Sequence, residues 1–95
     1  MFVVFLKFAA NKAQAPHFMD GHNAWIKRGF DTGVFLLAGS LGPGLGGGIL
    51  AHGIARAALE AFVAEDPFVA QQVVTPEIYE IAPGRSDERL AFLRG

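Results

Sequence analysis

Residues 22–41, HNAWIKRGFDTGVFLLAGSL, place an apolar helix face, a tight turn and a buried strand in direct succession. Residues spaced three or four apart lie on the same face of a helix. One such face is formed here by Phe18, His22, Trp25, Ile26, Gly29 and Phe30. Such a face is expected to pack against a sheet. His22 is its ionisable member, and a buried imidazole needs partners for its two ring nitrogens. The partner of His22 is therefore the main question for function.

The composition limits the size of the fold and its partners. A chain of 95 residues is expected to form one domain, and a domain this small buries only part of its surface on its own. Yet 52% of the residues are hydrophobic and only 18% are charged, which is more apolar material than one small core can hold. We therefore predict a homodimer, with a higher oligomer as the alternative. The net charge of −1 indicates no nucleic-acid partner. The lack of cysteine excludes disulfides and thiolate catalysis.

No charged residue lies between Asp31 and Arg56 when His52 is neutral, and this length could span a membrane. Its middle reads GSLGPGLGGG, however, and Pro43 within a glycine cluster would break a helix. Two strands flanking a turn explain the segment better. The N-terminal run MFVVFLKF is too short for a signal sequence and has no cleavage site of small residues. We predict a soluble, cytoplasmic protein that does not contact membranes.

Hydrophobic runs and chain breakers predict the other elements. Strands are expected at residues 2–8, 34–41, 48–53 and 78–82, the last with an alternative start at residue 73. Helices are expected at residues 16–31 and 54–65. The buried stripe of the second helix is expected to comprise Ile54, Ala58, Ala61 and Phe62. Asp66 would cap a short turn over residues 67–72, Pro76 suggests an edge strand or a bulge, and residues 86–95 form an amphipathic tail.

This order, β-α-β-β-α-β, predicts an α+β fold with a ferredoxin-like antiparallel sheet. Two helices would cover one face of the sheet. The other face is rich in Val, Phe, Leu and Ile, and two such sheets packed face to face would bury it. The topology therefore agrees with the dimer that the composition predicts.

Two residues are candidates for acid–base chemistry. An imidazole titrates near neutral pH, so His22 suits a general acid or base. Its helical spacing alone favours a core histidine bonded to a backbone carbonyl. Asp66 precedes a proline and is a good helix cap. If the second helix lies beside the first, Asp66 could also accept a hydrogen bond from the imidazole of His22 and raise its basicity.

A metal site was considered at His17, Asp20 and His22 and is discounted. His17 and His22 are five residues apart and point away from each other on a helix, and one carboxylate does not compensate for that. His17 is expected to be exposed near the start of the helix. His52 could face either the site or the dimer interface, although a histidine at a strand end is more often structural.

The segment Gly42 to Gly47 matches G-x-G-x-x-G, but it lies in a hairpin without a following helix to bind a pyrophosphate. We therefore reject a nucleotide site and predict no cofactor. Ser40 lacks the surrounding G-x-S-x-G motif of a nucleophile. Three aromatic residues are expected in the core, or as walls of a pocket for an aromatic ligand: Trp25, Phe30 and Phe35.

The segments HNAWIKRGF, VFLLAGSL, GGGILAHG, EDPFV and GRSDERLAFL lie in an order and spacing that resemble the YCII-related (YciI-like) family across nearly the whole chain. The resemblance implies a single YCII-related domain over residues 1–95 that dimerises through its sheets as a dimeric α/β barrel. It also implies a His–Asp active site at His22 and Asp66. One group of that family resembles dehydrochlorinases of chlorinated hydroxyhydroquinones, and similar barrels include muconolactone isomerases. At Ser40 many relatives have proline, so the pocket near this strand end should differ.

We therefore predict a small, cofactor-independent enzyme of the lyase or isomerase type with a small, aromatic or lactone-like substrate. His22 would move the proton and Asp66 would orient the imidazole. Substrate contacts are expected from Trp25, Gly39, Ser40 and His52. Two alternatives remain open. One is a non-catalytic ligand-binding or interaction module with the same pocket, and the other is a monooxygenase-like barrel that acts without a cofactor.

Overall fold

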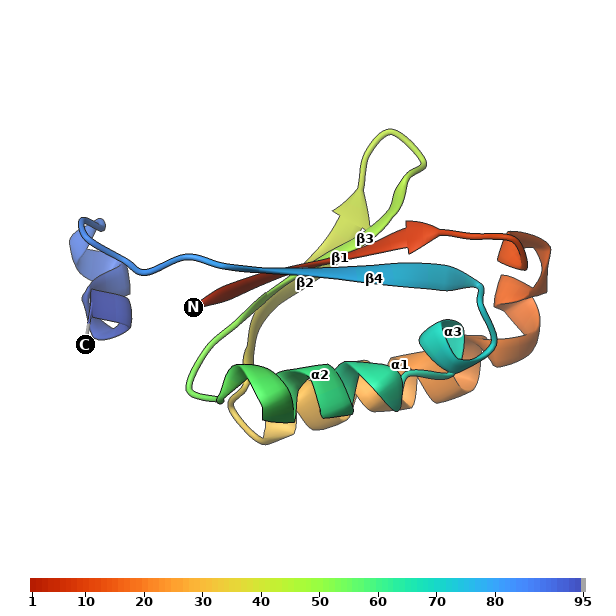
Figure 1. The fold of residues 1–95 in the computed structure, drawn as a ribbon, viewed down its shortest axis with the longest axis horizontal. Helices are drawn as coiled ribbons and strands as arrows, with labels where there is room; N and C mark the ends of the chain where they lie inside the picture. The colour runs from red at the N-terminus through yellow and green to blue at the C-terminus, as the bar shows by residue number, and fades with distance from the viewer. Residues whose placement is uncertain (95) are drawn as a thin grey trace.

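A computed structural model describes residues 1–94 of the chain (Figure 1). The strands are β1 (Phe2–Phe8), β2 (Phe35–Leu41), β3 (Gly46–Ala51) and β4 (Val74–Glu80). The helices are α1 (Ala15–Asp31), α2 (Arg56–Ala64) and α3 (Pro67–Ala70), with 3-10 segments η1 (Lys12–Gln14) and η2 (Glu88–Arg94). The strands form one antiparallel sheet in the order β2-β3-β1-β4. The predicted β-α-β-β-α-β order with a ferredoxin-like sheet is confirmed, with α3 as a short addition before β4.

The bounds of β3 and β4 differ from the predictions by two residues or more, and β3 ends at Ala51 instead of residue 53. β3 begins at Gly46 instead of Gly48, because Gly46 and Gly47 pair with β1 on one side and with β2 on the other. Glycines favour turns locally, and only the two neighbouring strands hold them in an extended ladder. β4 begins at Val74, close to the alternative start, and ends two residues early at Glu80. It is an edge strand, as Pro76 suggested.

All three α-helices lie on one side of the sheet (Figure 1). Phe2, Val4 and Leu6 alternate along β1 and point into the layer between sheet and helices, where each is at most 5% exposed. Trp25 of α1 is fully buried there, and its indole Nε1–H donates to the carbonyl of Phe62 at 2.8 Å. This bond ties α1 to α2 and satisfies the polar atom of a large core residue.

The buried face of α2 differs from the predicted stripe. Leu59 and Val63, one helical turn apart, are buried, whereas Ala58 and Ala61 are exposed. Burial of the larger side chains removes more apolar area from water, so the helix turns them and not its alanines toward the sheet. Ile54 and Phe62 are partly buried against the same core.

We expect Gly29→Ala to destabilise the fold by about 1 to 3 kcal/mol, although alanine is the better helix former. A Cβ at position 29 would clash with the ring of Phe35, so α1 could not pack as close to β2. Gly21→Ala in the same helix is the matched control, because its Cβ would meet only the side chain of Pro67, with its nearest atom at 3.1 Å. Urea unfolding should show a change below about 1 kcal/mol for that control. Equal stabilities of the two variants would contradict the close approach.

The sheet face opposite the helices is open and apolar. Leu37, Leu50, Val3 and Tyr79 pair across the four strands and form one row on this face. Leu37 is 55% exposed and Tyr79 is 52% exposed. Beyond β4, η2 lies past the end of the sheet, at the left of Figure 1. Within residues 1–94, no helix has both the length and the hydropathy needed to cross a membrane.

Candidate functional site

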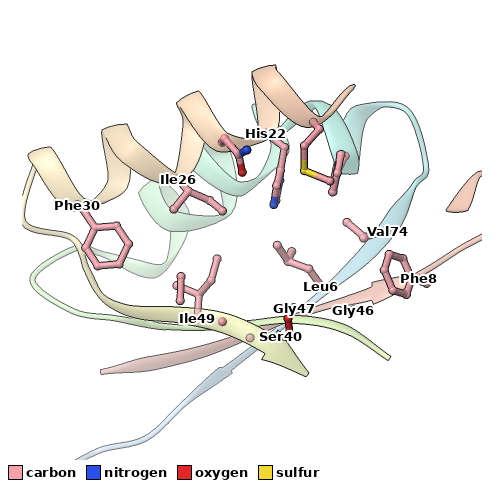
Figure 2. Close-up of a pocket in the computed structure, with 16 residues that line it drawn as sticks. Leu6, Phe8, His22, Ile26, Phe30, Ser40, Gly46, Gly47, Ile49 and Val74 are labelled. Carbon is pink, nitrogen blue, oxygen red and sulfur yellow. The ribbon is translucent and has the colours of Figure 1, made fainter. Parts of the chain in front are cut away.

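A cavity of about 370 Å³ lies between α1 and one end of the sheet (Figure 2). Its roof is α1, its floor is formed by β1, β2 and β3, and α3 and β4 close one side. The lining residues are Leu6, Phe8, Met19, His22, Asn23, Ile26, Phe30, Ala38, Gly39, Ser40, Gly46, Gly47, Gly48, Ile49, Phe68 and Val74. Most of these side chains are apolar, which is typical of sites for small organic ligands.

His22 enters the cavity from the roof, and Figure 2 shows its imidazole pointing from α1 toward the sheet. Its Nδ1 lies 2.9 Å from Oδ1 of Asp66, 44 residues further along the chain. The side chain of Asp66 is fully buried, and that of His22 is 13% exposed. The interpretation of His22 as a histidine bonded to a backbone carbonyl is therefore wrong, because its partner is a carboxylate.

The turn that begins α3 holds Asp66 in place. As the N-cap of α3, Asp66 accepts a hydrogen bond from the Phe68 amide at 3.0 Å, and Pro67 takes the first helical position. The same Oδ1 accepts from His22, so one oxygen serves as both helix cap and imidazole partner. Within the described residues, Oδ2 of Asp66 has no hydrogen-bond partner.

Phe68 orients the imidazole from a second direction. Its ring stacks on that of His22 with centroids 3.9 Å apart and planes 5° from parallel. Trp25 lies beyond, with its ring centroid 6.0 Å from that of His22. The short segment Asp66 to Phe68 therefore supplies both the acceptor for Nδ1 and a flat surface for the ring. Sequence reasoning missed Phe68, and the available signal was its place two residues after the capping aspartate.

These contacts determine which ring nitrogen of His22 can accept a proton from a ligand. A carboxylate can only accept, so Nδ1 carries the proton that is donated to Asp66. The other nitrogen, Nε2, then has a free lone pair in the neutral ring. Because the ring lines the cavity, Nε2 can take a proton from a ligand, and Asp66 can stabilise the imidazolium that results.

The remaining predicted site residues separate into two groups. Gly39 and Ser40 line the cavity near the end of β2. Trp25 does not line it, because this residue is fully buried behind His22. His52 lies elsewhere, with its ring 5.4 Å from that of Phe92 in η2. His52 directly follows β3 at its far end, whereas the cavity lies at the end of β3 where Gly46 begins it.

The residues considered for a metal do not form a cluster. His17 is exposed near the start of α1, as expected. Among residues 1–94, no three His, Asp or Glu side chains lie close enough to hold a metal ion. The G-x-G-x-x-G segment forms the β2–β3 turn and the start of β3, with no helix directly after it.

No protein-family model matches the chain, and no curated protein matches its sequence. Among solved structures, the chain is similar to 5-chloro-2-hydroxyhydroquinone dehydrochlorinase (TftG) from Burkholderia phenoliruptrix AC1100, determined in complex with 2,5-dihydroxybenzoquinone. The TM-score is 0.69 at 14% sequence identity, and the match covers 88% of this chain and 96% of the other. At this identity the likeness concerns the fold. It agrees with the predicted ferredoxin-like fold.

Proposed function

We propose that this chain is a YciI-like protein and a small acid–base enzyme of the lyase or isomerase type that needs no cofactor. The observation that carries the proposal is the bond from His22 Nδ1 to the fully buried Asp66, 2.9 Å long, on a ring that lines an apolar cavity. Burial of a carboxylate is costly unless it is paired, and here the pairing leaves one nitrogen free at the cavity. This is the arrangement that general base catalysis requires.

In the proposed reaction, Nε2 of His22 removes a proton from a C–H or O–H group of the ligand. The electron pair left behind forms a double bond within the ligand, and in an elimination the leaving group departs from the neighbouring atom with the electron pair of its own bond. In an isomerisation the imidazolium returns the proton to another ligand atom, and in an elimination it releases the proton to solvent. Asp66 remains ionised throughout and stabilises the imidazolium. The name dehydrochlorinase of the fold neighbour describes an elimination of this kind and supports the proposal.

A turnover screen tests the proposal. The protein is incubated with hydroxylated, halogenated and lactone-type ring compounds, and products are identified by mass spectrometry. For at least one class of compound we expect a product. An elimination would give a product lighter by the mass of a hydrogen halide or of water, and an isomerisation would give a product of unchanged mass with altered absorbance. Products that depend on added oxygen would instead support the monooxygenase-like alternative.

One observation favours a non-catalytic ligand-binding module as the second candidate. Among the described residues, His22 is the one titratable side chain that lines the cavity, so a reaction would depend on a single group for both proton steps. Compounds that raise the melting temperature but yield no product in the screen would favour this alternative.

The open sheet face supports the proposed homodimer. The row of Leu37, Leu50, Val3 and Tyr79 is mainly apolar, and an ion pair beside it joins Lys7 Nζ to Glu77 Oε1 at 2.7 Å. The hydrogen bond from Lys7 lowers the pKa of Glu77, so the pair is lost only when the pH falls through that lowered pKa. Within residues 1–94, the face is therefore mainly apolar and its charged side chains are paired, as a self-complementary interface requires.

We expect Leu37→Asp to convert the dimer into a monomer, because the two-fold symmetry would bury two like charges in one interface. Light scattering coupled to size exclusion measures the mass directly. Leu45→Asp is the matched control, since Leu45 is 49% exposed but lies in the β2–β3 turn. A wild-type protein of monomeric mass, or a dimer that survives Leu37→Asp, would contradict the sheet interface.

A further inference from the structure

The floor of the cavity contains a glycine that the fold itself does not require. Gly47 of β3 pairs with Ser40 of β2 and with Leu6 of β1 in one row across the sheet. Leu6 is 3% exposed and points toward the helices, so position 47 faces the cavity as well. Figure 2 shows Gly47 and Ser40 on the strands below His22.

Neither backbone conformation nor packing explains this glycine. Gly47 does not have a positive φ, so any residue could adopt its backbone conformation. A Cβ at this position would meet only the carbonyl oxygen of Gly39 at 3.5 Å, an ordinary contact. By contrast, a Cβ at Gly46 would clash with the backbone of Leu6. Glycine within a strand costs stability relative to alanine. What its absent side chain provides is open space between His22 and the sheet.

The charge of the lining restricts what can fill that space. Within residues 1–94, no Lys, Arg, Asp or Glu side chain lines the cavity. Its polar side chains are His22, Asn23 and Ser40, and His22 is already paired with a carboxylate. A ligand carboxylate would therefore lose its hydration without gaining a cation to balance its charge. A hydroxyl group can instead donate to Nε2 of His22 and lose little on burial.

From these observations we propose that the cavity binds an uncharged, planar ring with a hydroxyl group, such as a phenol, and that Gly47 sets the space for the ring. The ring lies over the bare backbone of Gly47, between Ser40 and the imidazole, with its hydroxyl directed at Nε2. Ligands with a carboxylate on the ring are rejected. This inference deepens the proposed function and rests on it, because both require a ligand in the same cavity.

Binding, and not turnover, tests the proposal. The probes are 4-methylphenol and 4-hydroxybenzoate, which share the ring and the hydroxyl and differ in methyl against carboxylate. Dissociation constants come from NMR titration of labelled protein, with the signals of His22 and Ser40 as reporters of the site. We expect 4-methylphenol to bind at least about tenfold more tightly than 4-hydroxybenzoate, because the carboxylate is desolvated without a partner. Equal affinities, or no shift of the cavity signals with either probe, would overturn the proposed ligand class.

Substitution of two glycines, one in the cavity floor and one outside the cavity, tests the role of Gly47. Gly47→Ala places a methyl group in the ring space and should weaken 4-methylphenol binding by about tenfold. Gly84→Ala is the control, because Gly84 is exposed in the segment after β4, is not among the residues that line the cavity, and would place its Cβ where nothing lies within 4 Å. Both variants should keep or slightly raise the melting temperature, because alanine loses less conformational entropy on folding than glycine does. Unchanged binding by Gly47→Ala would overturn the role of Gly47. Size exclusion of both variants checks that the oligomer is retained.

These results separate the inference from the proposed function. If 4-methylphenol binds as expected and the turnover screen yields no product, the ligand class stands and the enzyme proposal fails. If the screen instead finds a carboxylate-bearing substrate converted by His22, the enzyme proposal stands and the ligand class fails.

Discussion

Substitution of His22 by asparagine should lower turnover of a ring substrate by about a hundredfold to ten thousandfold. The amide nitrogen of asparagine can take the place of Nδ1 and donate to Asp66 Oδ1, so the buried carboxylate keeps a partner. What the variant lacks is a basic nitrogen at the position of Nε2. The loss should therefore appear in kcat, while the affinity for a ring ligand changes much less.

The measurement is steady-state turnover of the best substrate from the screen, with thermal unfolding of the same samples. His17→Asn is the matched control, because His17 lies on the same helix and is exposed. His52→Asn is a second control, since its ring contacts Phe92 away from the cavity. Full activity of His22→Asn would refute the assignment of His22 as the base, and an equal loss in both controls would show that the effect is not specific.

Substitution of Asp66 should separate its two roles. Asp66→Asn keeps an oxygen that can cap α3 and accept from His22, but it removes the negative charge. The imidazolium formed during the reaction then loses its counter-ion, and turnover should fall at least about a hundredfold with a nearly unchanged fold. Asp66→Ala removes both hydrogen bonds as well. It should lower the free energy of unfolding by about 1 to 3 kcal/mol, because a helix cap is lost and the imidazole N–H is left without a partner.

Urea unfolding and turnover of the two variants provide the comparison. A fully active Asp66→Asn would mean that Asp66 serves only as a helix cap. A stable Asp66→Ala would mean that neither of its hydrogen bonds contributes to the fold. The turnover of Asp66→Asn and the stability of Asp66→Ala together therefore show whether Asp66 contributes to the fold, to the reaction or to both.

Much of the local structure was predictable because neighbouring residues determine it. The helical spacing around His22 and Trp25 predicted a face against a sheet, and the structure places both there. The dipeptide Asp66–Pro67 predicted a helix cap, and the side chain accepts from the Phe68 amide as expected. The helix face is predicted from residue spacing and the cap from an adjacent proline, and the folded chain contains both.

Predictions failed where distant segments compete for the same space. Ala58 and Ala61 were expected inside, but Leu59 and Val63 occupy the core because the sheet offers volume for larger side chains. His52 was expected near the site, and the register of β3 carries it to the other end of the strand. Phe68 was not identified at all, because stacking on His22 requires that α1 and α3 lie together.

The sequence by itself therefore determined the order of the elements, the ferredoxin-like topology, the helix face that carries His22 and the cap at Asp66. These follow from periodicity and turn chemistry, which act over a few residues. Only the tertiary structure decided that His22 bonds to a carboxylate 44 residues away, that Phe68 covers the ring and that Gly47 leaves the floor open. Such contacts depend on how helices pack over a sheet, and the volumes of all the side chains between them set that packing together.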